Sequence, residues 1–383
     1  MNLGGFRIAT IRGIPIRIHF TFLLVLPLIA FSFARTFQEA AELAAVPPER
    51  LAGSPWLWGL GVAIALFASV LVHELAHALY ALRKGGRIRD ITLLMLGGVS
   101  QMSEPPREAR HEAVMALVGP AVSLGLGGVF YVLQSLAAEV SFNLRFALFY
   151  LGTLNLFLGF FNLLPAFPMD GGRILRALLV GRLGLVRATS VASRVGKVFA
   201  VLFAVWGFLS FNMLLLLIAF FVFVGAEGET RGVMVKALLG RLRVRDLMSD
   251  EVFAIPADLS VHDAAERMLR ERRLAFAVLM DGGAVGLVTL EAVQAIPPDR
   301  RSQVPVRSIV VGTTPLSPSE DAGKALRLMS ESDVPQLPVA EGGTLVGTLS
   351  REDIVRGLKL SELEATQQLS PQWPARRHRE IPA

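Results

Sequence analysis

The sequence predicts a polytopic α-helical membrane protein with about six transmembrane helices, followed by a cytoplasmic α/β pair of repeated domains. First, 53% of the 383 residues are hydrophobic and only 18% are charged, which is too apolar for an ordinary soluble enzyme of this size. Second, the runs long enough to cross a bilayer lie between residues 14 and 226, whereas residues 240–360 have the composition of a soluble domain. Third, that soluble half contains a weak internal repeat.

Six apolar stretches have the length of a transmembrane helix. We place them at about 15–34, 56–82, 112–137, 145–165, 191–209 and 211–226. The turn between the last two is so short that they also fit one long, bent segment. Three arginines, Arg7, Arg12 and Arg17, lie before or at the start of the first stretch and no small-residue cleavage site follows it, which favours a retained helix over a signal peptide.

Positive charge predicts how these helices are oriented. Lysines and arginines are concentrated before the first stretch and after the second and fourth, and few follow the first, third and fifth. The positive-inside rule therefore places the N-terminus, the 83–111 and 166–190 loops and everything after residue 227 in the cytoplasm, in a multi-pass protein of the plasma membrane. The net charge of +6 is spread over short loops, so the expected partner is the lipid bilayer and no nucleic acid is expected.

The soluble half is predicted to consist of two copies of one α/β unit, at 244–300 and 301–360. Each copy has a Val-Arg-x-(Leu/Ile) start, a Pro before an acidic turn, an amphipathic helix, a strand, a Gly-Gly turn, a second strand and a final helix. The other boundaries that we predict are a membrane domain at 1–230, a linker at 231–243 and a polar tail at 361–383. That tail lacks periodicity and is expected to be disordered.

The motif HELAH, residues 73–77, places ionisable side chains within the second apolar stretch. On a helix, His73 and His77 lie one turn apart on the same face, so their imidazoles can share one metal ion, and Glu74 is placed to exchange a proton with a water molecule on that metal. The motif also arises by chance. A carboxylate near bilayer depth, however, costs roughly 2.5 to 3.5 kcal/mol, which favours a functional site. The chain has no cysteine, so the metal must be held by histidine and carboxylate groups.

A zinc site of this kind needs a third protein ligand, and Asp170 is the best candidate. The position six residues after His77 is Arg83, so the third histidine of a metzincin is absent. Asp170 follows the fourth stretch, which the charge pattern brings out of the membrane on the same side as the second. The segment PMDGG is also typical of a surface Asp-Gly turn, and the residues alone leave both interpretations open.

HELAH in an early span and GFFNLLPAFPMDGGR in a later one together resemble the site-2 protease family of intramembrane zinc metalloproteases, peptidase family M50. The resemblance covers most of residues 6–226. It implies one zinc ion on His73, His77 and Asp170, with Glu74 as the general base. It also implies that Asn162 helps to hold the substrate or its developing oxyanion, although a buried asparagine can instead satisfy helical carbonyl groups.

Further segments have counterparts in that family. PIRIHFTFLL resembles its first-span signature, in which His19 has a structural role, and Gly119 and Pro120 lie in the family's Ala-Gly-Pro-like position. ITLLMLGGVSQM has strand-like character and resembles the family's sheet or re-entrant segment beside the active site. An edge strand there would hold an unwound substrate segment through main-chain hydrogen bonds.

The soluble repeats resemble a tandem pair of CBS domains, which often bind adenine nucleotides such as ATP or AMP. In that family a Gly-ϕ-ϕ-(Thr/Ser)-x-x-Asp strand end contacts the ribose and phosphates. The second copy, GTLSRED, has Ser350 and Asp353 at these positions, whereas the first copy, GLVTLEA, has Thr289 but Ala292 in place of the acid. At most one good ribose site is therefore expected. The alternative is a spacer that forms a homodimer whatever it binds.

These observations predict an intramembrane zinc endopeptidase that cleaves a transmembrane or membrane-associated protein near the cytoplasmic face, regulated by nucleotide binding to, or dimerisation of, its CBS domains. The family suggests a membrane-tethered transcription regulator, such as an anti-sigma or pro-sigma factor, as the substrate. The alternative from another class is a CBS-regulated transporter or channel with intramembrane His and Glu along an ion path. Against that alternative, the ionisable groups cluster at one depth.

Overall fold

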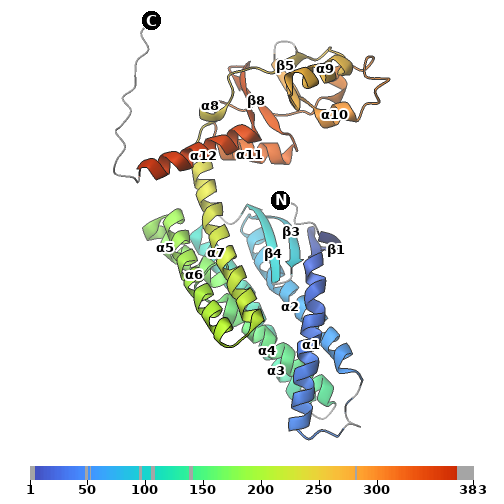
Figure 1. Cartoon of the computed structure of the whole chain (residues 1–383), viewed down its shortest axis with the longest axis vertical. Coiled ribbons are helices and arrows are strands. Elements are labelled where there is room, and N and C mark those ends of the chain that lie inside the picture. Colours follow the sequence, from blue (N-terminus) through green and yellow to red (C-terminus); the bar gives the residue numbers. More distant parts are fainter. Residues whose placement is uncertain are drawn as a thin grey trace. The chain divides into compact units, whose positions relative to one another are not determined.

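The structure is a computed structural model that describes residues 5–47, 51, 53–94, 97–104, 108–137, 141–280 and 283–368. The chain divides into two compact units, Met1–Arg231 and Gly232–Ala383, and each is described by itself (Figure 1). The first unit is a set of long helices with a small sheet, and the second is built from shorter helices and strands.

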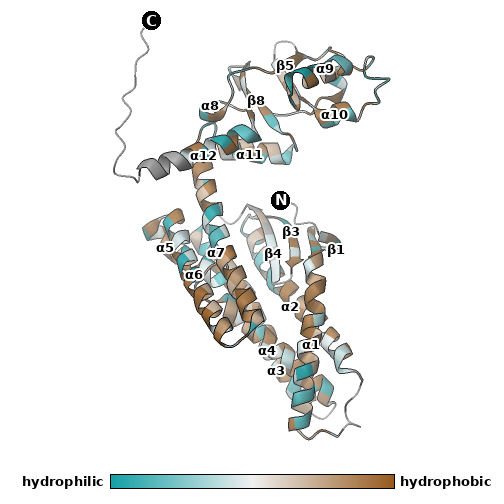
Figure 2. Ribbon diagram, viewed as in Figure 1, coloured by the Kyte–Doolittle hydropathy of each residue, from teal (hydrophilic) through white to brown (hydrophobic). Residues whose placement is uncertain are grey.

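Six helices of the described residues are long and apolar enough to cross a membrane, which confirms the predicted polytopic architecture. They are α1 (Phe20–Leu43), α2 (Pro55–Arg83), α3 (Ala109–Leu136), α4 (Phe142–Asn162), α6 (Leu185–Leu209) and α7 (Met213–Leu239). Hydrophobic residues colour most of their length in Figure 2. Large apolar side chains such as Trp206, Phe208 and Phe220 point outward from these helices, as expected for surfaces that face lipid.

The predicted first span was wrong at its start. Residues Ile14–His19 form strand β2, whose sequence IPIRIH alternates with the period of a strand. Helix α1 begins only after His19, because the imidazole Nδ1 of His19 accepts a hydrogen bond from the backbone N–H of Thr21 at 3.3 Å and caps the helix. This is the structural role expected for His19. The helix then continues to Leu43, beyond the predicted end at 34.

The last two spans are separate helices, and the second of them is longer than predicted. The break lies at Phe211, which has a left-handed backbone (φ 51°), and at Asn212, whose Oδ1 accepts a hydrogen bond from the N–H of Leu215 at 3.0 Å. Helix α7 does not end at 226 but runs on to Leu239, so one continuous helix extends from the first unit into the second.

A four-stranded sheet packs against one end of the helices (Figure 1). Its order is β1 (Gly5–Ile11), β2, β3 (Arg87–Leu94) and β4 (Gly97–Glu104). β2 and β3 are parallel, and the other two pairs are antiparallel. The apolar residues Ile14, Ile16 and Ile91 pack against Ala78 of α2, which fixes the sheet on that helix. The strand-like character predicted for residues 91–102 is thus confirmed for the described residues; residues 95 and 96 lie outside them.

Within the predicted 166–190 loop lies a further helix, α5 (Asp170–Leu183). The turn before α5 is held closely by neighbouring backbones. The N–H of Phe167 donates a hydrogen bond to the carbonyl of Ala192 on α6 at 3.3 Å. Gly196 of α6 and Gly225 of α7 lie so close to Phe167 and Pro168 that a β-carbon on either glycine would overlap with them. The first residue of α5 is therefore positioned by two other helices.

The second unit contains the two predicted copies of one fold. The first has α8 (Val244–Leu247), β5 (Ala254–Pro256), α9 (Val261–Glu271), β6 (Ala275–Met280), β7 (Gly283–Thr289) and α10 (Leu290–Gln294). The second has η3 (Val306–Ile309), α11 (Ala322–Glu331), β8 (Gln336–Glu341), β9 (Thr344–Ser350) and α12 (Arg351–Gln368). The hairpins β6–β7 and β8–β9 pair in equivalent registers, Ala275 opposite Thr289 and Gln336 opposite Ser350.

The predicted boundaries of the domains at 1–230, 244–300 and 301–360 and of the linker at 231–243 stay predictions. The start of the disordered tail at 361 was wrong, because α12 continues through residues 361–368. The rest of that tail, residues 369–383, lies outside the described residues.

Candidate metal and catalytic site

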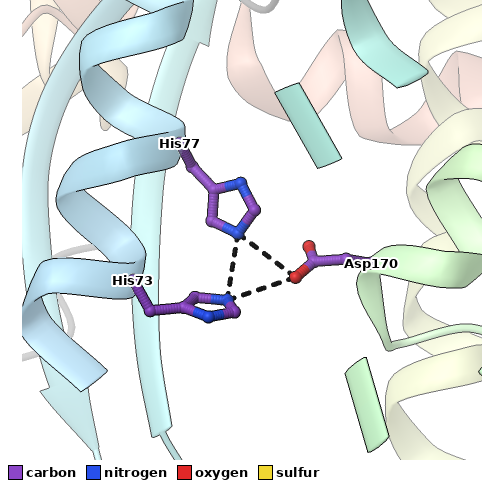
Figure 3. A group of neighbouring side chains, drawn as sticks. All are labelled: His73, His77 and Asp170. Carbon is purple, nitrogen blue, oxygen red and sulfur yellow. Dashed lines mark hydrogen bonds and ion pairs between the residues drawn. The ribbon is translucent and has the colours of Figure 1, made fainter. Parts of the chain in front are cut away.

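Three buried side chains from distant parts of the chain converge on one point (Figure 3). His73 and His77 of α2 direct their Nε2 atoms toward each other at 3.1 Å. Oδ2 of Asp170, the first residue of α5, lies 3.2 Å from each of these nitrogens. His73 and His77 are 4% and 5% exposed, and no other group of this kind occurs among the described residues.

The three donor atoms fit a zinc ion. Zinc bonded to histidine nitrogen and carboxylate oxygen at about 2.0–2.1 Å in a tetrahedron has donor atoms about 3.3–3.4 Å apart. The observed separations of 3.1 and 3.2 Å are close to this value. Three protein donors with a free fourth position are also the pattern of a catalytic zinc site. Asp170 thus lies beside the two imidazoles and not in an isolated surface turn, and its role as a ligand stays a prediction.

Helix α3 orients both imidazole rings from behind. Nδ1 of His77 donates a hydrogen bond to the carbonyl oxygen of Met115 at 2.6 Å, which leaves the Nε2 lone pair free for a metal. Nδ1 of His73 lies 2.9 Å from Oγ of Ser123. Gly119 lies between these two residues, and a β-carbon there would overlap with His77. The helix can approach the rings this closely because position 119 has no side chain.

The carboxylate of Asp170 is held in its charged form. Burial alone would raise the pKa of Asp170, but the neighbouring imidazoles and the positive charge of Arg173 lower it well below its usual range. An ionised carboxylate is the form that binds a metal. Gly171 follows at once, and a β-carbon on it would overlap with the carbonyl oxygens of Leu163 and Leu164, so the turn into α5 requires glycine.

The side chain of Glu74 faces strand β4 of the sheet, whereas the carboxylate of Asp170 faces the two imidazoles. Its Oε2 atom accepts a hydrogen bond from Oγ of Ser100 on β4 at 2.7 Å. A β-carbon on Gly98, two residues earlier on the same face of β4, would overlap with the Glu74 side chain. Glu74 directly follows His73 on α2 and contacts strand β4.

Asn162 ends helix α4, and its recorded hydrogen bond stays within that helix. Its Nδ2 atom donates to the carbonyl oxygen of Leu158 at 3.0 Å. This bond is the one expected if Asn162 only satisfies a carbonyl group of its own helix. The role of Asn162 in holding a substrate stays a prediction.

Comparison with known proteins decides the family. The model of Peptidase family M50 matches residues 61–143 and 126–203, and the CBS domain model matches residues 244–295 and 303–360. A zinc metalloprotease of Methanocaldococcus jannaschii is 33% identical over 358 residues, which cover 94% of this chain and 97% of that protein. The chain belongs to peptidase family M50.

Two further similarities concern parts of this M50 chain. Stage IV sporulation protein FB of Bacillus subtilis is 29% identical over 144 residues, or 37% of this chain and 49% of that protein. The solved structure of a site-2 protease from Methanocaldococcus jannaschii is 36% identical, covers 60% of this chain and 96% of that one, and has a TM-score of 0.44. The M50 family model, the zinc metalloprotease relative and the six apolar helices show that the M50 protein is a multi-pass membrane zinc metalloprotease with a C-terminal pair of CBS domains.

The predicted nucleotide contacts of the CBS domains all lie at helix starts. Oδ2 of Asp353 accepts hydrogen bonds from the N–H and the hydroxyl of Ser350, at 3.0 and 2.6 Å, and the N–H of Asp353 donates to Oγ of Ser350 at 3.1 Å. Thr289 caps α10 by accepting from the N–H of Ala292 at 3.3 Å. Helix capping is by itself a sufficient reason for Thr, Ser and Asp at these three positions. Nucleotide binding by them therefore stays a prediction.

The sequence did not reveal the residues that support this M50 site. Ser123 and Ser100 are single serines in apolar or strand-like segments, and Met115 contributes only its carbonyl group. A signal was present on α3, where Met115, Gly119 and Ser123 are spaced by four residues and therefore share one helix face. Met115 and Ser123 each lie one turn from Gly119, which belongs to the motif that resembles the family's third span.

Proposed function

We propose that this M50 protein is an intramembrane endopeptidase that cleaves a transmembrane or membrane-associated protein near the cytoplasmic face of the plasma membrane. The observation that carries the proposal is the convergence of His73, His77 and Asp170 next to Glu74. His73, His77 and Asp170 would hold one zinc ion, which supplies a Lewis acid that activates water and polarises the peptide carbonyl.

Glu74 is the general base in this proposal. Its carboxylate takes the proton of the attacking water and then donates a proton to the departing amine nitrogen, which becomes the new N-terminus. The hydroxyl of Ser100 holds one carboxylate oxygen of Glu74, so the base keeps its place during both transfers. Asn162 is proposed to hold the substrate or its oxyanion from the end of α4.

The substrate would bind as an extended strand along β4. In the described sheet β4 is an edge strand, bonded to β3 alone, and its inner face carries Gly98 and Ser100 against Glu74. A peptide that pairs with this edge satisfies its main-chain groups, which a helix unwound in a membrane otherwise could not do. A substrate peptide paired with this edge of β4 would also have its backbone close to Glu74.

Charge supports the depth and orientation of the site. α2 ends at Arg83, and His77 lies six residues earlier, or about 9 Å along a helix. The lysines and arginines that follow α2 and α4 favour a cytoplasmic position for this end and for the N-terminus and CBS domains. The site would then lie within the membrane, roughly two turns from its cytoplasmic surface.

The CBS domains are proposed to regulate cleavage from the cytoplasm. They would do so by binding ATP or AMP near Ser350 and Asp353, with Thr289 in the weaker copy, or by joining two chains in a homodimer. A membrane-tethered transcription regulator, such as an anti-sigma or pro-sigma factor, is the proposed substrate class.

Substitution Glu74→Gln tests the reaction. It removes the base but none of the proposed ligands, so the variant should retain zinc and lose cleavage. Comparing membrane proteomes of cells with the wild-type and Glu74→Gln proteins should show intact substrates that accumulate only in the variant. Full cleavage by Glu74→Gln would contradict the mechanism. The transporter alternative is set aside because the family is one of zinc metalloproteases.

A further inference from the structure

Arg176 of α5 joins three helices through its guanidinium group. Its Nε atom donates a hydrogen bond to Oε1 of Glu112 on α3 at 3.0 Å, and its Nη2 atom contacts the same oxygen. Its Nη1 atom lies 3.7 Å from Oε2 of Glu229 on α7. The side chains of Arg176 and Glu112 are only 13% and 17% exposed, so solvent weakens this ion pair less than one on the surface.

The same guanidinium group contacts the turn that leads into α5. Its Cζ atom lies 5.0 Å from the centre of the Phe167 ring, in a cation–π contact. Phe167 is completely buried and is bonded through its N–H to Ala192 of α6. Arg176 therefore connects α3 and α7 with the segment that carries Asp170.

Helix α3 presents Glu112 close to the groups that orient the two imidazoles. Glu112 and Met115 are three residues apart, and Gly119 and Ser123 follow at intervals of four, so these residues form one stripe on α3. The last three contact His73 or His77. One face of α3 thus positions both α2, with two proposed ligands, and α5, with the third.

Helix α5 is attached by ionic contacts as well as by apolar packing. Its fully buried residues are Gly171 and Gly172, which have no side chains to pack, while Leu175 packs against Phe167 and Ala192. The ion pairs of Arg176 with Glu112 and Glu229 add contacts with α3 and α7. Ionic contacts therefore contribute to the position of α5.

We propose that Arg176 is a positioning residue of the metal site. Through Glu112 and Glu229 it fixes α5 so that the carboxylate of Asp170 meets the imidazoles of α2. This inference rests on the metal site proposed above and adds residues that act through Asp170.

Zinc affinity of the purified full-length protein tests this proposal, measured by competition with a chromogenic chelator. Arg176→Gln and Glu229→Gln should each weaken zinc binding about 10-fold, as for other groups that support metal ligands. Arg176→Lys keeps the positive charge, but a single ammonium group cannot contact Glu112 and Glu229 on opposite sides as the guanidinium group does. The zinc affinity of Arg176→Lys should therefore fall between those of Arg176→Gln and the wild type. Combining Arg176→Gln with Glu229→Gln should cost little more than Arg176→Gln alone, because both remove the same contact.

The matched control is Glu227→Gln. Glu227 lies two residues from Glu229 on α7 and pairs with Lys197 of α6 at 2.5 Å, so its loss removes the same charge without touching α5. This variant should bind zinc like the wild type. At saturating zinc the Arg176→Gln protein should regain cleavage, which a misfolded protein would not do. Glu229→Gln, at a more exposed position, serves the same purpose if Arg176→Gln does not fold.

His73→Ala separates the two proposals. If His73→Ala loses zinc while Arg176→Gln and Glu229→Gln keep wild-type affinity, the positioning role is overturned and the metal site stands. If His73→Ala binds zinc like the wild type, the metal site itself is overturned. An equal loss in Glu227→Gln would also overturn the role of Arg176, because any lost charge on α7 would then have the same effect.

Discussion

Gly119 of α3 lies directly against the imidazole of His77. A β-carbon added to Gly119 would overlap with Nε2 of His77 and would lie 2.7 Å from Nε2 of His73. These are the two nitrogens that face Asp170, so even a methyl group would displace a proposed ligand or fill the place of the metal.

Gly119→Ala should therefore lower zinc affinity by at least about 10-fold, the loss that follows from disturbing the surroundings of a metal ligand. The controls are Gly125→Ala and Gly128→Ala, on the same helix, where a β-carbon would meet no atom within 4 Å. Chelator competition measures all three. Normal zinc binding by Gly119→Ala would show that the imidazoles do not hold the metal in the arrangement described.

Ser123→Ala removes the hydroxyl that lies 2.9 Å from Nδ1 of His73. Without it the ring can rotate and change its tautomer, so we expect zinc affinity to fall about 10-fold while the fold is kept. Ser135→Ala, near the other end of α3, is the control, because the hydroxyl of Ser135 bonds only to its own helix in the recorded contacts. Equal affinities in the two variants would argue against an orienting role for Ser123.

Ser100→Ala should affect turnover without affecting zinc. Ser100 contacts Glu74 but none of the three proposed ligands, so the variant should keep its metal. Its kcat should fall about 10-fold, which is less than the full rate enhancement that a positioned general base provides. The assay is cleavage of the substrate found in the Glu74→Gln comparison. Thr10→Ala, on the opposite edge strand β1, is the control. A loss of zinc in Ser100→Ala would contradict the separation of base and ligands.

Asp353→Ala should weaken ATP or AMP binding to the full-length protein in detergent, measured by calorimetry. Since Asp353 also caps α12 together with Ser350, the variant should lose about 1 kcal/mol of stability in the second unit. Glu352→Ala, at the neighbouring exposed acid, should change neither quantity. Unchanged nucleotide affinity in Asp353→Ala would remove the proposed nucleotide site and leave the capping role.

The absence of cysteine allows a direct test of orientation. Glu42 lies at the end of α1 and Lys84 directly after α2, and both residues are exposed. Each can be replaced by a single cysteine, in the variants Glu42→Cys and Lys84→Cys. A membrane-impermeant maleimide added to intact cells should label Glu42→Cys, whereas Lys84→Cys should be labelled only after lysis. The reverse pattern would place the N-terminus and the CBS domains outside the cytoplasm.

The sequence predicted best what depends on local spacing. The four-residue interval between His73 and His77 fixes both on one helix face wherever the helix lies, and long apolar runs mark where the spans are, although not where each one begins and ends. The start of α1 was missed because IPIRIH is apolar enough to extend a span, and only its two-residue alternation indicates a strand.

The supporting groups could not be predicted because they depend on how helices pack. The carbonyl of Met115 carries no signal in the residue type, and the partners of Arg176 lie on helices 64 residues before it and far after it in sequence. Charged residues near span ends were attributed to topology alone. The ion pairs of Arg176 with Glu112 and Glu229 become apparent only when the helices are seen packed together.

If the substrate pairs with strand β4 as proposed, that strand would also constrain which sequences the protease cuts. Gly98 and Ser100 face Glu74 because side chains alternate along a strand, and a substrate paired with β4 would alternate in the same way. Selectivity should then appear at every second position around the scissile bond, with the intervening positions tolerant of most side chains. Glycine, proline and β-branched residues near the cut would be favoured, because a segment that readily leaves its helix reaches the strand at lower cost.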